Sequence, residues 1–319
     1  MSSQKIISLI KKNKVFLIST HVNPDPDALC SELALAEYLK VLGKKVFIVN
    51  EDTVPQRLSF LPGTKKIQKY KKNKIVPYDI AIIVDCGDLD RIGKVKDCLK
   101  GNKPIVNIDH HITNDMFGHV NLLKPKASST GEVLYEFFKE AKFKLNRNVA
   151  LCLYAGIMTD TGSFRYENTT AHTHAIVADL MRFDFSANDL YQKLYDIIPL
   201  DDLKAFTQVI THFEALFGGR VVLVELNKKV LAKFSEAFDL RDAIFKFLRS
   251  IQGVEVIAIF TEVARNKTRI NLRSTNKVDV AKLANIFGGG GHKRASGCMI
   301  GGNIYKARQD FLKQLKKDL

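Results

Sequence analysis

The sequence of 319 residues lacks several features that would tie it to a membrane or an oxidising compartment. It has no run of about 18 apolar residues, the length that a transmembrane helix needs, which argues against a membrane span. Its five cysteines are scattered without a Cys-x-x-Cys pair, which argues against a disulfide framework and a zinc site. Lysines interrupt the apolar part of residues 1–20, so a secretory signal is not expected. These absences predict a cytoplasmic protein with reduced thiols and no membrane partner.

Positive charge exceeds negative charge, and the excess is unevenly distributed. The whole chain carries 49 Lys and Arg against 34 Asp and Glu, whereas residues 251–319 carry 13 against 5. A basic C-terminal segment favours a polyanionic ligand such as a nucleotide or RNA. A lysine-rich proteome would give a similar excess without such a ligand. A second basic run, residues 65–74, is interpreted as a solvated connection.

Hydrophobic patterns predict an α/β protein with two domains. Short apolar runs alternate with helical patterns over residues 1–185, which is typical of a mainly parallel sheet with helices on both faces. A helical linker is expected at residues 186–216, with a break at Pro199, followed by a smaller α/β domain at residues 217–319. The strands expected in the two domains are residues 15–18, 45–49, 79–84, 104–108, 221–225, 255–262 and 268–273. The main expected helices are residues 28–42, 130–141, 147–158, 171–182, 278–287 and 303–319.

Four apolar elements of the first domain end in acidic or imidazole side chains. These side chains are His21, Asp25 and Asp27; Asp85; Asp109, His110 and His111; and Asp160. Ligands of an open parallel sheet bind beyond the carboxyl ends of its strands, and so many acids need cations there. Mixed carboxylate and imidazole ligands favour manganese, iron or zinc over calcium, and more than four ligands predict two ions.

Each of these acids also has a purely structural interpretation. Asp27 could cap the helix that follows it, Asp85 could start a turn, and Asp160 could form an Asx-turn. The coincidence of four such ends, which include three histidines, favours a metal site.

The order of these motifs resembles the DHH phosphoesterase superfamily. The matching segments are His21-x-x-Pro24-Asp25-x-Asp27, Asp85 in Val-Asp-Cys-Gly-Asp, Asp109-His110-His111, and Asp160 in Thr-Asp-Thr-Gly. Residues 288–297, Gly-Gly-Gly-Gly-His-Lys-Arg-Ala-Ser-Gly, resemble the signature of the DHH-associated C-terminal domain. The combination is similar to the bacterial NrnA-like subfamily. Pro26 and Cys30 stand where this family frequently has glycine, and neither change removes an expected ligand.

The resemblance implies a role for each motif residue. His21, Asp25 and Asp85 would hold one metal ion, and Asp85 would bridge to a second. The second ion would also be held by Asp27, His110 and Asp160. Asp109 would orient the imidazoles, and His111 would face the phosphate as a catalytic group. Substrate binding is implied for Arg273, Gly289, Gly290, Gly291, His292 and Arg294.

The glycine run has two interpretations from its residues alone. Four consecutive glycines let backbone amides approach a ligand closely, but they are also typical of a flexible hairpin turn. The basic residues that follow, His292, Lys293 and Arg294, favour a phosphate or base clamp.

The resemblance implies an oligoribonuclease that degrades short RNA to mononucleotides and also dephosphorylates 3′-phosphoadenosine 5′-phosphate (pAp). Its cofactors would be two divalent metal ions, with manganese expected, and its ligands short RNA oligonucleotides and small nucleotides. Two alternatives stay open: a phosphodiesterase for cyclic di-AMP or pApA, and a nucleotide- or RNA-binding protein with a decayed catalytic core. The glycine–histidine segment argues against a family II inorganic pyrophosphatase. A homodimer is compatible with the sequence.

Overall fold

The chain divides into two compact units, Met1–Leu194 and Tyr195–Leu319. The computed structural model describes residues 2–73, 76–99, 101, 103–196, 198–235, 238–275 and 278–316. Within these ranges, no helix is both long enough and apolar enough to cross a membrane.

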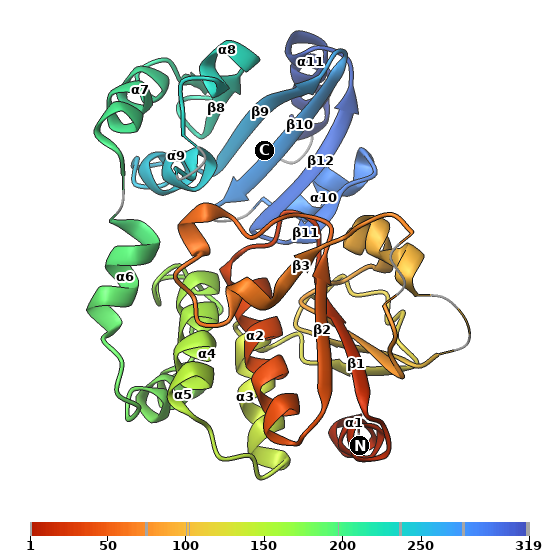
Figure 1. The fold of residues 1–319 in the computed structure, drawn as a ribbon. Coiled ribbons are helices and arrows are strands. Elements are labelled where there is room, and N and C mark those ends of the chain that lie inside the picture. Colours follow the sequence, from red (N-terminus) through yellow and green to blue (C-terminus); the bar gives the residue numbers. More distant parts are fainter. Residues whose placement is uncertain are drawn as a thin grey trace. The chain divides into compact units, whose positions relative to one another are not determined.

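A six-stranded parallel sheet forms the centre of the first unit (Figure 1). Its strands in chain order are β1 (Val15–Ser19), β2 (Lys45–Asn50), β3 (Ile67–Lys69), β4 (Ile80–Val84), β5 (Ile105–Asp109) and β6 (Val120–Leu123). They are arranged as β3-β2-β1-β4-β5-β6, so the chain winds in opposite directions on the two sides of the β1–β4 boundary. A ligand site is expected beyond the carboxyl ends of the strands at such a switch point.

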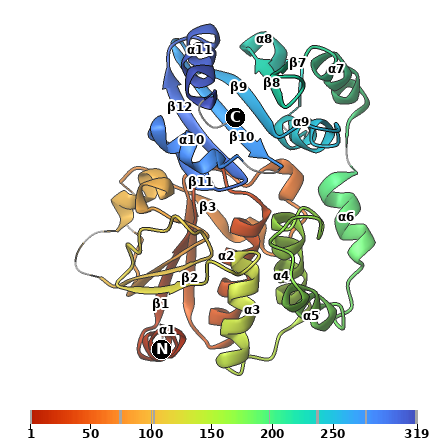
Figure 2. The same cartoon turned by 180° about the vertical axis from the view of Figure 1, so that it is seen from behind.

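Helices cover both faces of this sheet (Figures 1 and 2). On one face, α2 (Pro26–Val41) and α3 (Thr130–Glu140) contact the strands, and α4 (Arg147–Asp160) and α5 (Ala171–Leu180) pack onto these helices. On the other face, η3 (Leu89–Cys98) contributes Ile92 and Val95 to a core with Leu17 and Ile83. Because both faces are covered, β4 is buried at every position and its sequence is a continuous apolar run. Three further elements are α1 (Ser2–Lys12), beside β6, and the short helices η1 (Gln56–Leu58) and η2 (Thr64–Lys66).

The second unit contains a mixed six-stranded sheet in the order β11-β12-β10-β9-β8-β7. Its strands are β7 (Glu214–Leu216), β8 (Val221–Leu226), β9 (Val256–Ala264), β10 (Lys267–Ser274), β11 (Gly290–His292) and β12 (Ala295–Gly301). On one face, α10 (Val280–Ile286) and α11 (Ile304–Leu315) enclose a core around Phe260 and Phe311. On the other face, α7 (Leu200–Ile210) and α9 (Leu240–Leu248) pack over β8 and β9. The remaining helices are α6 (Ala187–Tyr195), between the two sheets in the chain, and α8 (Lys228–Leu231).

The predicted α/β class with two sheets is confirmed, and several predicted details are wrong. The basic run at residues 65–74 includes strand β3, although Lys74 lies outside the described residues. Helix α1 and strands β6, β7 and β12 were not predicted, and β7 occupies the end of the expected helical linker. Short edge strands such as β6 and β7 depend on pairing with a neighbour more than on their own pattern. The predicted glycine turn continues into strand β11 at Gly290. Of the predicted terminal helix, residues 317–319 lie outside the described residues.

Candidate metal centre

The switch point of the parallel sheet gathers the predicted ligands of the first unit. The loop after β1 carries His21, Asp25 and Asp27; Asp85 follows β4; Asp109 ends β5, and His110 and His111 follow it. Five of these side chains are at most 6% exposed: His21, Asp27, Asp85, Asp109 and His110. Buried ionisable groups at this density require charge partners or metal ions.

Asp25 and Asp27 accept hydrogen bonds from the first turns of two different helices. Asp25 is the N-cap of α2, where its Oδ1 accepts a hydrogen bond from the Ala28 amide at 3.0 Å, and Pro26 occupies the first turn. Asp27 does not cap its own helix. Its carboxylate accepts hydrogen bonds from the amides of Thr130 at 2.7 Å and Gly131 at 3.0 Å, at the start of α3. The capping role considered for Asp27 therefore belongs to Asp25 within α2.

A glycine of α4 makes room for the Asp27 carboxylate. A Cβ atom at Gly156 would lie 2.4 Å from Asp27 Oδ1, closer than any real contact. Helix α4 also extends to Asp160, two residues beyond its predicted end, so Asp160 lies in the last helical turn rather than in a following loop.

Asp85 lies at the centre of the cluster. Its Oδ2 is 3.6 Å from His21 Nε2, and its Oδ1 is 3.6 Å from His110 Nε2 and 3.7 Å from His111 Nδ1. The hydroxyl of Thr130 donates to Oδ1 at 2.9 Å. The backbone of Asp85 is in the left-handed region, with φ of 52°. Each carboxylate oxygen thus faces a different group of side chains, as a bridging ligand requires.

Backbone carbonyls orient two of the imidazole rings. His21 Nδ1 lies 2.9 Å from the Val22 carbonyl oxygen, and His110 Nδ1 lies 3.3 Å from that of Ala127. A carbonyl can only accept, so the hydrogen is on Nδ1 in each ring and a neutral ring turns the Nε2 lone pair towards the acids. His110 Nε2 lies 3.2 Å from Asp160 Oδ2.

His111 is held by a separate hydrogen-bond network. Its Nδ1 lies 2.7 Å from Asp109 Oδ1, and Asp109 Oδ2 accepts from Asn114 Nδ2 at 2.6 Å. Asn114 Nδ2 also donates to Asn107 Oδ1 at 2.8 Å and to the Cys86 carbonyl at 3.2 Å. Asp109 therefore connects the third imidazole to the ends of β4 and β5.

Burial and crowding shift the pKa values of the cluster. Burial, together with the charges of Asp85 and Asp160, raises the pKa of Asp27 well above its ordinary value. Burial opposes the charged form of Asp85, yet the hydrogen bond with His21 and the nearby histidine charges lower its pKa. Burial also opposes the charged form of His110, but the hydrogen bond to Asp160 and the charges of Asp160, Asp85 and Asp27 together outweigh it and raise this pKa well above the ordinary value. The buried carboxylates repel one another when they are ionised, and divalent cations bound between them would offset that repulsion.

The geometry groups the donor atoms into sets suited to metal ions. His21, Asp25 and Asp85 offer ligand atoms within 4.8 Å of one another, and so do Asp27, His110 and Asp160. A third set of the same compactness consists of Asp85, Asp109 and His111. This mixture of carboxylate and imidazole donors fits divalent transition metals.

Residues that were not predicted from the sequence complete the surroundings. Ser129 caps α3 by accepting from the Glu132 amide, and this Ser-x-x-Glu pattern is visible in the sequence as a helix start. The approach of Thr130 and Gly131 to Asp27 is not visible, because more than 100 residues separate them. Asn114 carries no sequence signal beyond its closeness to the Asp-His-His triplet.

The residues predicted to bind substrate lie in the second unit. Arg273 of β10 and His292 of β11 share a face of the sheet, because both are in register with Ala295 of β12. The Arg273 guanidinium lies over the Phe245 ring at 4.8 Å from its centroid. Two of the glycines are required by the fold itself: a Cβ at Gly289 would lie 2.2 Å from the Gly297 carbonyl oxygen, and Gly291 has a φ of 135°. Gly290 lies in β11, and Arg294 follows that strand.

The chain belongs to the DHH family. Residues 15–157 match the DHH family, N-terminal domain, and residues 222–319 match the DHHA1 domain. The family resemblance expected from the five motifs is confirmed.

Named relatives place the chain more closely within that family. It is 32% identical to the probable bifunctional oligoribonuclease and PAP phosphatase NrnA of Streptococcus mutans, over 98% of this chain and 97% of the relative. It is 28% identical to the bifunctional oligoribonuclease and PAP phosphatase NrnA of Thermus thermophilus, over 95% of this chain and 89% of the relative. The crystal structure of an exopolyphosphatase-related protein from Bacteroides fragilis matches with a TM-score of 0.89 and 26% identity, over 99% and 96% of the two chains.

Proposed function

We propose that the protein is a metal-dependent phosphoesterase that degrades short oligoribonucleotides to mononucleotides and dephosphorylates pAp. The central observation is the complete ligand set around Asp85, in a chain whose relatives are named bifunctional oligoribonuclease and PAP phosphatase. Those names favour this function over a phosphodiesterase for cyclic di-AMP or pApA. The intact ligand set argues against a binding protein with a decayed catalytic core.

Two divalent ions, in the first instance manganese, would occupy the cluster. His21, Asp25 and Asp85 would hold one ion, and Asp27, His110 and Asp160 would hold the other together with Asp85. Bound there, the ions would lower the pKa of an attacking water and offset charge on the phosphoryl oxygens. The two oxygens of Asp85 already face the two groups of ligands, which supports its bridging role.

The protein's own side chains would position the phosphate. Asp109 fixes the ring of His111 through Nδ1, so the opposite nitrogen is the one that would contact a phosphoryl oxygen and stabilise its growing charge. Asp109 would act by orienting this ring. Substrate phosphate or base would be bound by Arg273, Gly289, Gly290, Gly291, His292 and Arg294.

The same proposal covers the organisation and setting of the protein. Residues 1–185 would form the catalytic domain and residues 217–319 the substrate-binding domain. Residues 186–216 would join them, although α7 and β7 of this segment already pack into the second unit. The protein would act in the cytoplasm on short RNA and small nucleotides, as a monomer or a homodimer.

A comparison of four substrates tests the proposed function. Purified protein with added Mn²⁺ is incubated with a pentaribonucleotide, pAp, pApA and cyclic di-AMP, and products are separated by chromatography. We expect mononucleotides from the RNA and AMP from pAp. Cleavage of only pApA or cyclic di-AMP would favour the alternative phosphodiesterase, and no cleavage of any substrate would refute the proposal.

Substitution of the bridging residue tests the mechanism. Asp85→Asn keeps the shape of the side chain and removes its charge, so we expect turnover to fall by more than about 100-fold with an unchanged circular dichroism spectrum. Asp88→Asn is the matched control, because Asp88 lies three residues away, is exposed, and caps η3. Equal activity of the two variants would contradict the bridging role.

A further inference from the structure

Strand β10 carries a row of polar side chains on the face of the second sheet that is opposite α10 and α11. Helix α9 packs on this same face. Burial alternates along the strand, so Arg269, Asn271 and Arg273 share this face while the residues between them enter the core. All three are half-buried. Arg269 is in register with Thr261 of β9 on one side and with Met299 of β12 on the other.

Between the two arginines, the row of residues across the strands continues from Asn271 through two glycines, here called the glycine floor. Asn271 is in register with Gly297 of β12, and Gly297 is in register with Gly290 of β11. This row of backbone is bordered on one side by Arg273 and His292 and on the other by Arg269. A flat group such as a nucleobase or a ribose can approach the backbone closely over such a floor.

Two polar atoms on this face have no hydrogen-bond partner among the described residues. They are Asn271 Oδ1 and Thr261 Oγ1, and both atoms are buried. Thr261 is directly opposite Arg269, and Asn271 lies at the end of the glycine floor. Buried polar atoms are nearly always satisfied, so a further polar partner such as a water molecule is expected beside each of these two atoms.

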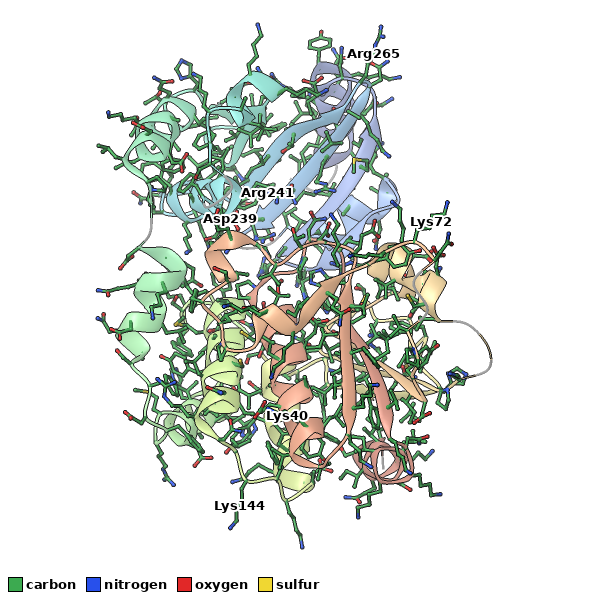
Figure 3. All side chains as sticks on the ribbon, in the orientation of Figure 1. Lys40, Lys72, Lys144, Asp239, Arg241 and Arg265 are labelled. Atoms are coloured by element: carbon green, nitrogen blue, oxygen red, sulfur yellow. The ribbon has the colours of Figure 1, made fainter. Side chains whose placement is uncertain are left out.

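A second arginine reinforces the charge of Arg269. Burial and the nearby charge of Arg241 lower the pKa of the Arg269 guanidinium. Arg241 lies in the first turn of α9, two residues after the N-cap Asp239 (Figure 3), where the helix dipole disfavours a cation. Over the part of the chain that the structure describes, neither arginine pairs with a carboxylate. Helix α9 packs over this same face of the sheet, so the two cations lie on one side of it, where they can bind an anion.

We propose that Arg269 and Arg241 bind an additional phosphate of an oligoribonucleotide, which pAp does not possess. The inference rests on the proposed function and narrows it: among the residues proposed there to bind substrate, Arg273 and His292 would take the non-reacting phosphate of either substrate. pAp has two phosphates, one that reacts and one that would be bound there. A 5′-phosphorylated strand of three or more nucleotides has a further phosphate, which Arg269 and Arg241 would take. The subsite would therefore distinguish RNA from the mononucleotide.

Substitutions that remove one guanidinium test this subsite. Arg269→Met and Arg241→Met keep an unbranched stem and remove the charge. For each, we expect kcat/KM to fall about tenfold more for a 5′-phosphorylated pentaribonucleotide than for pAp, the loss expected for one charge-assisted hydrogen bond. Arg269→Lys should recover part of the loss. The matched control is Arg265→Met, because Arg265 is exposed at the turn between β9 and β10 (Figure 3).

A binding measurement gives a readout that does not depend on turnover. With metal ions chelated, the affinity for the pentaribonucleotide is measured at several salt concentrations. The slope of log K against log salt should decrease by about 0.7 in Arg269→Met, the value for one phosphate contact on a single strand. Equal losses on both substrates, no loss, or the same loss in Arg265→Met would overturn the subsite. If the wild-type protein hydrolysed neither substrate, the proposed function would fail, and the salt slope would still decide the subsite.

Discussion

Replacing Gly156 by alanine should stabilise helix α4 locally and disturb the Asp27 carboxylate at the candidate metal centre. Inside a helix, glycine to alanine ordinarily stabilises by about 1 kcal/mol. At this position the new Cβ would lie 2.4 Å from Asp27 Oδ1 and 3.4 Å from the Asp27 Cα atom. The carboxylate cannot simply withdraw, because the amides of Thr130 and Gly131 hold both of its oxygens.

The size of the effect follows from those two hydrogen bonds. If the Asp27 carboxylate rotates away, both bonds break, at a cost of about 1–3 kcal/mol each. After the helical gain is subtracted, we expect the free energy of unfolding to fall by about 1–5 kcal/mol. The displaced carboxylate would no longer face His110 and Asp160, so we also expect Mn²⁺ affinity to fall by about 10–100-fold.

Urea denaturation with and without Mn²⁺, together with calorimetric titration of Mn²⁺, measures both effects. Gly301→Ala is the control, since nothing lies within 4 Å of the atom that it would add. A Gly156→Ala protein that is as stable as the wild type and binds Mn²⁺ equally well would refute the reasoning.

Three further predictions concern the surroundings of the same cluster. Asn114→Leu removes the donor that holds Asp109, so we expect kcat on pAp to fall by about tenfold with little change in KM, and a change confined to KM would contradict a positioning role. Burial raises the pKa of Glu32 to about 8, against an ordinary 4.5, so the folded protein retains a proton that the unfolded chain loses. Stability should therefore decline between about pH 4.5 and 8, and Glu32→Gln should gain stability relative to the wild type across that window. With ions chelated, wild-type urea curves that share one midpoint at pH 5, 7 and 9 would contradict this. Chelation should lower Tm, because the acids around Asp85 lose their counter-ions, and Mn²⁺ at 100 times its Kd should restore about 2.7 kcal/mol; an equal restoration in Asp85→Asn would argue against the site.

The sequence predicts the parts of the site that lie next to their strands. Strands β1, β4 and β5 are buried on both faces of the sheet, so each is a mostly apolar run with a visible end, interrupted in β5 by Asn107. His21, Asp85 and the Asp-His-His triplet directly follow or complete those runs. Their convergence then follows from the parallel arrangement alone.

Contacts between distant segments could not be predicted in this way. The position of Asp27 depends on the start of α3, and its space depends on a glycine of α4. Neither helix shows a pattern that reveals this contact, since helical periodicity identifies a buried face without identifying its partner. The same limit applies to Gly289, whose lack of a side chain is required by the carbonyl of Gly297 rather than by a ligand.

The two carboxylate oxygens of Asp25 have different functions, one in starting a helix and one in the candidate metal centre. Oδ1 accepts from the Ala28 amide and starts helix α2, while Oδ2 lies 3.9 Å from His21 Nε2 and faces the cluster. A glutamate would keep the charge but place its oxygens one carbon further out, beyond the reach of a cap that needs a short side chain. Selection for a well-formed helix and selection for cation binding therefore act on the same atoms. A substitution at Asp25 would therefore alter the start of α2 and the candidate cation site at the same time.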